Sequence, residues 1–532
     1  MTHPPSTANR QIARAAGMVM FAILFGQLTG LARGIIVANI FGTSIMLDAF
    51  YAANRVSETL FLLVAGGALG SAFIPTFTGL LARDDKDSAW RLAFSLANAV
   101  TLTLSLLAAL TAFFAPQVVR YALAPGFSAN LEIFALTVSL LRVQLISAVL
   151  FGLGGLIVGI LNAHQIFLIP ALTPALYQLG IIFGAIFLAS SLGIYGLAWG
   201  VVIGAALYLL IQLPSLTRLI TNLRLPAVHF WSLNLKDSHV RQVLRLMLPR
   251  LLGVAVVQLN FWVNTNLASR MEDGSVTSLT YGFSLMLMAQ AAIAQSVAIA
   301  AMPTFSAQHA LGKVDEMRSS VAASLRAVFM MALPASLGLM ILRKPLISLL
   351  YQRGEFDQRA VEMVAWALLW YAAGLVGHSI MEVLTRAFYA QQDTKTPVAI
   401  GTIAMGLNVL FSIWFSRLFA EVGWYPLGGL ALANSLATAL EAAALFIFMR
   451  KRLNGIEGKS LADGAWRVGL AGLGMAVGLL AWIQVSAGWT RWLVTLGGVA
   501  LGGVLYFAGI VVLKIPEVKT IFSALQRRLI KN

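Results

Sequence analysis

Apolar runs long enough to cross a lipid bilayer recur along the whole chain. A membrane helix needs roughly 20 apolar residues, and the sequence offers about fourteen such runs. Only 11% of the 532 residues are charged, whereas soluble domains carry roughly 25%. Membrane β-strands would instead give short segments of alternating hydrophobicity. The sequence therefore predicts an all-α polytopic membrane protein.

The predicted spans form two groups of six and a final pair. In chain order they are 16–40, 49–77, 92–115, 133–161, 167–189, 193–213, 246–267, 279–305, 321–342, 360–387, 396–415, 427–448, 468–485 and 493–513. This pattern divides the chain into a first lobe (1–216), a polar connector (217–245), a second lobe (246–449) and a C-terminal segment (450–532). The last segment holds two further helices and a basic tail.

Lysine and arginine gather in one set of loops, which includes the N-terminus, the connector and the C-terminal tail. Cytoplasmic loops are the ones that collect these residues and face anionic lipid. An even number of spans then places both termini in the cytoplasm. The formal net charge of +16 is explained by this topology, so we expect no nucleic-acid partner.

Short motifs recur in the two halves at a nearly constant offset. Pro-Thr-Phe occurs at 75–77 and at 303–305, and Gly126 matches Gly354, both at an offset of 228. A third set, at an offset of 227, pairs Ala163, Gln165 and Pro170 with Ala390, Gln392 and Pro397. Such an ordered series indicates duplication of a six-span unit. Because six is even, the copies are parallel, and two such lobes can enclose a central cavity and work as a transporter.

The polar stretch FYAQQDTKTPVAIG, residues 388–401, lies between the tenth and eleventh predicted spans. Pro397 suits the first turn of the next helix, where its missing N–H costs nothing. Thr394 or Thr396 can cap free N–H groups there. We interpret the stretch as a structural corner rather than a binding site.

Ionisable residues inside apolar spans are costly and usually face a cavity or a partner. Arginine suits phosphate because its planar fork donates two hydrogen bonds at once, so an anionic headgroup is the expected ligand. The alternative is that Arg55 with Glu58, and Asp48 with Arg33, form ion pairs between helices. These span residues are Arg33, Asp48, Arg55, Glu58 and Arg142 in the first half and Glu382, Arg386 and Glu441 in the second.

Three asparagines, Asn260, Asn264 and Asn408, also lie in predicted spans. Their amide oxygens suit a cation such as sodium, although such residues more often form hydrogen bonds between helices. The six histidines show no metal-ligand spacing, cysteine is absent, and no nucleophile lies beside a base in the sequence. We therefore predict a transporter, not an enzyme, with no metal site and no catalytic residues.

The chain resembles the MurJ/MviN family of lipid II flippases, within the MOP transporter superfamily. The resemblance covers nearly the whole chain, including the last two spans. It is carried by GLARGIIVANIFGTSIMLDAFYAANR (30–55), IPTF (74–77), APGF (124–127), GILNAHQIFLIPALTP (159–174), RGEFD (353–357) and RAFYAQQDTKTPV (386–398).

This resemblance implies a function in the bacterial cytoplasmic (inner) membrane. Members move the undecaprenyl-pyrophosphate-linked peptidoglycan precursor to the outer leaflet by alternating access. The headgroup passes through the central cavity, and the last two spans form a groove for the polyprenyl tail. Transport in the family depends on membrane potential, with sodium bound in some members, and proteins of cell-wall synthesis are expected partners.

Matched to the family pattern, Arg33, Asp48, Arg55 and Arg142 occupy expected positions, but several cationic positions are neutral. Gln27 replaces an arginine, and Phe61, Leu62, Gly66 and Gly67 replace an Arg-Arg and a Glu-Gly pair. Phe283 and Ser284 replace an Asp-Arg pair. Either Arg142 and Arg386 compensate, or the substrate differs. The candidate substrate-binding residues are Gln27, Arg33, Asp48, Arg55, Glu58, Arg142, Ser284, Glu382 and Arg386.

Three other functions stay open from the sequence. The neutral positions favour a flippase for another polyprenyl-linked oligosaccharide, such as an exopolysaccharide or O-antigen unit. A drug/cation antiporter of the same superfamily would lack the last two spans and would carry carboxylates in its cavity. A non-transporting scaffold for cell-wall synthesis is the remaining alternative.

Overall fold

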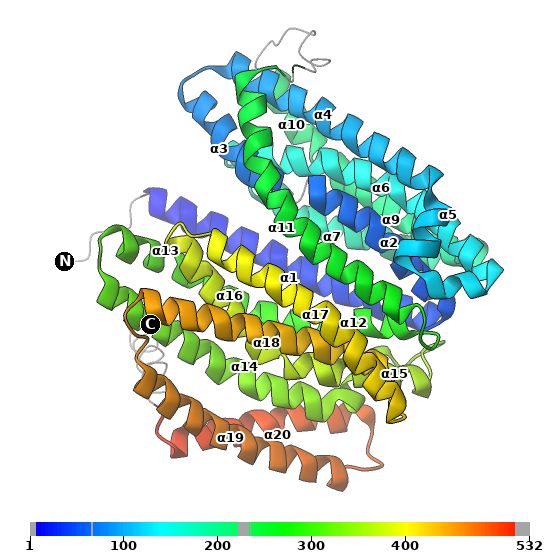
Figure 1. Cartoon of the computed structure of the whole chain (residues 1–532), viewed down its shortest axis with the longest axis vertical. Helices are drawn as coiled ribbons and strands as arrows, with labels where there is room; N and C mark the ends of the chain where they lie inside the picture. The colour runs from blue at the N-terminus through cyan, green and yellow to red at the C-terminus, as the bar shows by residue number, and fades with distance from the viewer. Residues whose placement is uncertain (1–6, 65–67, 222–233, 235, 516–532) are drawn as a thin grey trace. The chain divides into compact units, whose positions relative to one another are not determined.

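The computed structural model describes residues 7–64, 68–221, 234 and 236–515, and the regular elements among them are helices (Figure 1). The predicted all-α membrane fold is confirmed. Ten helices in the described ranges are long and apolar enough to cross a membrane, or eleven if one bent pair counts as a span. The predicted number of fourteen spans is not confirmed.

The helices divide into two compact units, Met1–Val276 and Thr277–Asn532. In the first unit, α6 packs against α2, α4 and α9, while α7 packs against α1 and α9. The α-helices of this unit are α1 (Thr7–Phe41), α2 (Ile45–Val64), α3 (Ala68–Ala82), α4 (Lys86–Phe113), α5 (Ala115–Gln117), α6 (Leu131–Ala163), α7 (Leu168–Phe183), α8 (Ala189–Leu192), α9 (Ile194–Leu210), α10 (Leu213–Thr221) and α11 (Ser238–Ala268).

Single predicted spans correspond to more than one helix in several places. The span 49–77 becomes α2 and α3, and Gly66 and Gly67 between them lie outside the described residues. Most of the connector, residues 222–233 and 235, and the tail from 516 onward also lie outside them. Short π-helical or 3-10 segments at Val118–Leu123, Pro125–Ala129, Gly184–Leu188 and Ala291–Gln295 interrupt other regions.

The second unit contains the remaining helices. In Figure 1, α19 and α20, coloured brown to red, lie along α14. Its α-helices are α12 (Ser275–Gln290), α13 (Ser296–Ala310), α14 (Val314–Tyr351), α15 (Gln358–Ala373), α16 (Leu375–Ala390), α17 (Lys395–Glu421), α18 (Leu427–Arg452), α19 (Gly458–Val485) and α20 (Arg491–Val512).

Helix α11 is grouped with the first unit, although the sequence repeat makes it the first span of the second copy. It packs on α2 and α3. Beyond its C-terminal end, Gly126 approaches so closely that a Cβ there would lie 2.7 Å from the Arg270 nitrogen. The predicted lobe boundaries stay a prediction.

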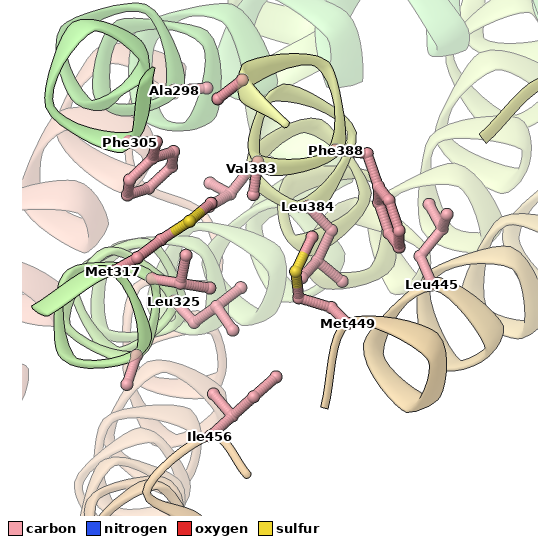
Figure 2. Packing of buried hydrophobic residues seen from close by; sticks show 14 of the residues in the cluster. Ala298, Phe305, Met317, Leu325, Val383, Leu384, Phe388, Leu445, Met449 and Ile456 are labelled. Atoms are coloured by element: carbon pink, nitrogen blue, oxygen red, sulfur yellow. The ribbon is translucent and has the colours of Figure 1, made fainter. Parts of the chain in front are cut away.

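Each unit contains a cluster of buried hydrophobic side chains. In the second unit, side chains of α13, α14, α16 and α18 point toward one another, including Phe305, Met317, Leu384 and Met449 (Figure 2). In the first unit, Phe77 occupies the corresponding place against α4 and α6. Both phenylalanines of the repeated Pro-Thr-Phe motif are fully buried.

The corners between repeated helices share an unusual backbone. Gln165 and Gln392, at an offset of 227, have positive φ angles of 60° and 59°. Asp84 and Gly312, at an offset of 228, have φ angles of 57° and 67°. Helices often end on a left-handed residue that closes their last carbonyls. The corners therefore support the duplication read from the sequence.

Asp393, not a threonine, supplies the cap at the corner after α16. Its Oδ1 accepts from the Thr396 backbone N–H at 3.0 Å, and its Oδ2 lies 2.7 Å from Arg452. Thr394 makes no side-chain cap bond, so the predicted threonine cap was wrong. Pro397 lies in the first turn of α17, as expected. A carboxylate was favoured because it can accept both the free N–H and the neighbouring guanidinium.

Replacing Asp393 should therefore destabilise the second unit. Asp393→Ala removes the cap and the ion pair, and we expect a loss of about 1–2 kcal/mol in the free energy of unfolding. Asp393→Asn keeps a capping oxygen and should lose less. Thermal unfolding in detergent measures both, and equal loss in the two variants would contradict a capping role.

The same residue should contribute to acid sensitivity. Burial opposes ionisation of Asp393, but hydrogen bonds from Thr396 and Arg452 outweigh it and lower its pKa below the ordinary 3.8. A depressed carboxyl pKa stabilises the folded state at neutral pH, and that contribution is lost as the pH falls below 3.8 toward the lowered value. The stability difference between wild type and Asp393→Ala should shrink over that range.

Candidate functional site

Helix α2 carries a polar stripe through an otherwise apolar span. Tyr51, Asn54, Arg55 and Glu58 are spaced at i, i+3, i+4 and i+7, which places them on one helix face. Ionisable residues inside the membrane are functional candidates by default. This stripe and the helices that pack on it form the candidate site.

Arg33 on α1 meets the stripe in a small pocket. The pocket is lined by Arg33, Tyr51, Asn54 and Tyr177 together with apolar side chains. Within the described residues, the Arg33 Nε is buried without a hydrogen-bond partner. A buried donor without a partner is costly, and a polar ligand would satisfy it.

Gln178 on α7 places a second polar group beside α1. Its Oε1 is likewise buried and unpartnered in the described part of the chain. Gly30, one turn before Arg33, lies against the amide, since a Cβ there would be 3.7 Å from the Gln178 Nε2. The α1–α7 contact thus offers both an unused donor and an unused acceptor.

Arg55 is already engaged by two neighbours. Its Nη1 lies 3.0 Å from the Glu58 Oε2, and its guanidinium stands over the Phe261 ring at 4.8 Å. The arginine side chain is 22% exposed and the glutamate 45% exposed. Arg55 and Glu58 therefore form an ion pair, but it lies within α2 and does not join two helices, as had been expected. It keeps Arg55 partly neutralised and fixed in position.

Helix α11 contributes further contacts to the stripe. The Trp262 Nε1 donates to the Thr59 Oγ1 at 2.9 Å, and that hydroxyl donates to the Arg55 carbonyl at 2.7 Å. Together with Phe261, these bonds hold α2 and α11 against each other at the level of Arg55. They give the site a rigid wall of aromatic and hydroxyl groups.

Asp48 lies at the start of α2, with a different partner from the one expected. It is 2% exposed, and its Oδ2 accepts from the Gly274 N–H at 2.8 Å. Gly274 has φ 91°, and a Cβ there would lie 2.4 Å from the Thr43 carbonyl oxygen. Asp48 therefore fixes the loop that follows α11.

Arg142 and Gln27 lie apart from these contacts. Arg142 is exposed on α6, and its Nε donates to the Ala112 carbonyl near the end of α4 at 3.1 Å. Gln27 is exposed on α1. Cations near a helix C-terminus interact favourably with its dipole. The position of Arg142 fits such a structural role.

The candidates in the second unit bond within their own helices. Arg386 pairs with Glu382 at 3.0 Å along α16, and the Ser284 Oγ donates to the Thr280 carbonyl at 2.7 Å. Their role in substrate binding stays a prediction.

The asparagines are hydrogen bonded within two different units. In the first, the Asn264 Nδ2 donates to the Asn260 Oδ1 at 3.3 Å. In the second, the Asn408 Oδ1 accepts from the Ser412 Oγ at 3.0 Å. In the described ranges, no group of three His, Cys, Asp or Glu side chains is placed to hold a metal ion. Sodium binding stays a prediction.

Known sequences agree with this architecture. The sequence model described as "Lipid II flippase MurJ" matches residues 37–497. A relative from Burkholderia cenocepacia, described as "Lipid II flippase MurJ", is 32% identical over 471 residues, or 88% of this chain and 89% of the relative. The chain belongs to the MurJ family. A Vibrio cholerae relative, described as a "Probable lipid II flippase MurJ", is 30% identical over 94% of both chains.

Solved structures show the same fold as this MurJ-family chain. A structure described as "Lipid II flippase MurJ, inward closed conformation" matches with a TM-score of 0.76 over 92% of this chain and 97% of that one, at 23% identity. A multidrug resistance MATE family transporter of the MOP superfamily, in an inward-facing conformation, matches with a TM-score of 0.67 over 82% and 98%, at 17% identity. These two matches concern the fold.

Sequence reasoning missed the uncharged members of the site in this MurJ-family chain. Asn54, Tyr177 and Gln178 accompany Arg33, whereas the uncharged residues predicted for the substrate site were Gln27 and Ser284. Two of these residues could have been found from the sequence. Asn54 falls on the same helical face as Arg55 and Glu58, and Gln178 is a lone amide in the apolar span 167–189.

Removing the Asp48 carboxylate should destabilise the first unit. Asp48→Ala leaves a buried N–H at Gly274 without this acceptor, and we expect a loss of about 1–3 kcal/mol in the free energy of unfolding. The control is Asp87→Ala, because Asp87 is exposed and paired with Arg91, a surface pair worth about 0–1 kcal/mol. Thermal unfolding of the two purified variants measures the difference. If Asp48→Ala were as stable as Asp87→Ala, the hydrogen bond from Gly274 to Asp48 would not stabilise the first unit.

Proposed function

We propose that this chain is a lipid II flippase, which moves undecaprenyl-pyrophosphate-linked peptidoglycan precursor across the bacterial inner membrane by alternating access. Membership of the MurJ family supports the proposal, as do relatives described as lipid II flippases that match over most of the chain. The protein transports its substrate and leaves it chemically unchanged.

The observation that carries the proposal is the open donor of Arg33. A pyrophosphate offers several anionic oxygens, and a guanidinium can bind them through charge-assisted bonds roughly twice as strong as neutral ones. The Arg33 Nε is buried, unpartnered among the described residues, and lies at a pocket with Asn54 and Tyr177. The pocket has a volume of about 10 Å³ in this structure, so it must widen before an anion can reach this donor.

Arg55 has a secondary role in this scheme. Glu58 offsets its charge and Phe261 holds it in place, so its electrostatic attraction for a distant anion is reduced. A phosphate that approaches Arg33 and displaces Glu58 would gain a second cation. We therefore assign the first contact to Arg33 and a later contact to Arg55.

The neutral positions shape the rest of the site. Ser284 of the second unit stands where the family pattern has an arginine, so the pyrophosphate is held mainly by Arg33 and Arg55 of the first unit, although Gln27 there is neutral too. Asn54, Tyr177 and Gln178 supply uncharged hydrogen-bonding groups around Arg33. Such groups suit sugar hydroxyls and the uncharged parts of the headgroup.

The C-terminal pair of helices is proposed to hold the polyprenyl tail. An apolar pocket lies between α14 and α19, lined by Phe329, Met330, Gly464 and Val468 among others. The Tyr506 hydroxyl of α20 donates to the Met330 carbonyl at 2.6 Å and fixes the pair on α14. An isoprenoid chain is apolar and would fit in such a pocket.

Other features of the proposal follow from topology. Both termini are placed in the cytoplasm because the basic loops lie on their side. Membrane potential or sodium drives the cycle, and proteins of cell-wall synthesis are the expected partners. The drug/cation antiporter is less favoured because α19 and α20 are present, and the scaffold because Arg33 lines a pocket. A flippase for another polyprenyl-linked oligosaccharide is the second candidate, favoured by the neutral Gln27 and Ser284.

A complementation experiment tests the function. In a bacterium depleted of its own lipid II flippase, this chain should restore growth, while Arg33→Ala should not. Losing a charged hydrogen bond of about 1.5–3 kcal/mol lowers affinity about 10- to 100-fold. Arg55→Ala should also fail, and Arg91→Ala, which removes an exposed arginine paired with Asp87, should rescue.

Protein levels in the membrane must be equal for all variants. Rescue by both Arg33→Ala and Arg55→Ala would remove these arginines from the mechanism. No rescue by the intact, membrane-inserted chain would favour another polyprenyl-linked saccharide. Proteoliposomes loaded with such a lipid or with lipid II then decide between the two substrates.

A further inference from the structure

One carboxyl group inside the membrane is used neither by the candidate site nor by the proposed function. Glu441 is the one acidic residue of α18, a helix that is long and apolar enough to cross a membrane. Its side chain is buried, at 9% exposure. Ionisable residues inside a span are costly, and by default they are functional candidates. Glu441 therefore needs either a partner or a role.

The carboxyl group of Glu441 lies against α17, the helix that runs beside α18 (Figure 1). A Cβ added to Gly401 of α17 would be 3.1 Å from the Glu441 Oε1 and 3.8 Å from its Cδ. A side chain at position 401 would therefore press on the carboxyl group. The glycine leaves the room that this group occupies.

Helix α16 packs on a different face of α18. A Cβ on Gly374, where α15 and α16 meet at an angle of 45°, would lie 2.4 Å from the Ser435 Oγ. A Cβ on Gly377 would lie 3.2 Å from the Ala439 Cα. Glu441 follows Ala439 by two residues, which turns its side chain about 200° around the helix. The carboxyl group therefore points away from the α16 contact.

The amides in this region are used elsewhere. The Asn408 Oδ1 accepts from the Ser412 Oγ at 3.0 Å, and the Asn434 Oδ1 is bonded to the His378 ring at 3.1 Å. Asn408 comes seven residues after Gly401, and Asn434 comes seven residues before Glu441. Seven residues of helix span about 10 Å. These amides are thus about two turns away from the carboxyl group.

Glu441 forms neither a hydrogen bond nor an ion pair within the described ranges, and burial is the one influence on its charge there. An isolated carboxylate charge is costly in apolar surroundings, whereas the neutral acid costs much less. The carboxyl oxygens are nevertheless not among the fully enclosed polar atoms. The packed contact therefore favours a protonated carboxyl group whose oxygens are not sealed off.

The charged groups on the neighbouring helices do not change this balance. On α16, Glu382 is paired with Arg386, and on α17 Lys395 is exposed, six residues before Gly401. The other titratable side chains on α18 and on the helices packed against it are Arg359, Glu362 and Tyr371 on α15, His378 and Tyr389 on α16, Arg417 and Glu421 on α17, and Arg450, Lys451 and Arg452 on α18.

We propose that Glu441 is a proton-binding site of this transporter, which holds a proton while α17 and α18 are packed as in this structure and releases it to water when their contact opens. On uptake, a carboxylate oxygen accepts a proton from water and becomes the O–H of a neutral acid. On release the proton returns to water and the negative charge reappears. Because each helix arrangement favours one protonation state, proton binding and packing are linked.

Infrared spectroscopy of the full chain in lipid nanodiscs measures proton binding directly. The C=O band of a neutral carboxylic acid that is lost in Glu441→Gln belongs to Glu441. We expect this band at about pH 6, where a glutamate in water is already ionised, and expect it to weaken as the pH rises toward about 9. Glu441→Asp, which keeps an acid, should show a band at a shifted frequency.

Glu421→Gln is the matched control, because Glu421 is an exposed glutamate of α17. Its spectrum at about pH 6 should keep the Glu441 band, since a glutamate in water is ionised there. Two results overturn the proposal. One is identical acid bands in the wild type and Glu441→Gln at about pH 6, and the other is a Glu441 band of constant height up to about pH 9.

The transport consequence rests on the proposed flippase function and is tested by flipping of lipid II in proteoliposomes. The wild-type rate should change at least about 5-fold between about pH 6 and about pH 9, and the rate of Glu441→Gln less than about 2-fold. Glu441→Asp and Glu421→Gln should keep a pH-dependent rate. Equal pH dependence in the wild type and Glu441→Gln overturns the linkage. Absence of flipping by the wild type counts against the proposed function, and the infrared titration then decides proton binding alone.

Discussion

The absence of water in the bilayer governs this structure. Each backbone N–H and C=O in a span needs a partner inside the protein, so continuous helices are the default and every interruption needs a substitute. The substitutes are visible at two interruptions in the described residues. Ser435 and Ser336 serve the carbonyls around Gly374, and Asp48 accepts the N–H of Gly274. At these interruptions, polar side chains of the protein take the place of the missing backbone hydrogen bonds.

The same constraint explains what the sequence could predict. Apolar runs and the repeated Pro-Thr-Phe motif placed the helices and the duplication, since both depend on local pattern. The break between α15 and α16 was not predicted, because the run 360–387 is long enough for one continuous span and the serines that satisfy its carbonyls come from other helices. The cap by Asp393 was missed for a similar reason. Its choice over Thr396 depends on Arg452, which is distant in sequence.

The candidate site contains both charged and uncharged polar residues, and the sequence predicted the two kinds unequally well. Arginine was easy to find in an apolar span, but Arg33 and Arg55 differ in a way that only contacts reveal. The Nε of each is buried without a hydrogen-bond partner among the described residues, but Arg55 is also paired with Glu58 through its Nη1 and lies over the Phe261 ring. The uncharged groups Asn54, Tyr177 and Gln178 converge from two helices. Which amide or phenol reaches a given arginine depends on helix rotation, which sequence periodicity fixes only approximately.

Helix α11 belongs to one half of the sequence repeat but packs with the other half. By sequence it is the first helix of the second copy, yet its contacts are with α2 and α3, so the boundary of the repeat and the boundary between the two compact units differ by one helix. The polypeptide crosses from the first compact unit to the second just after Gly274, which Asp48 fastens to the start of α2. The connector 217–245 therefore joins two helices of the same unit, α10 and α11. The chain passes from one unit to the other inside α12, whose first residue, Ser275, directly follows the glycine that the Asp48 carboxylate holds.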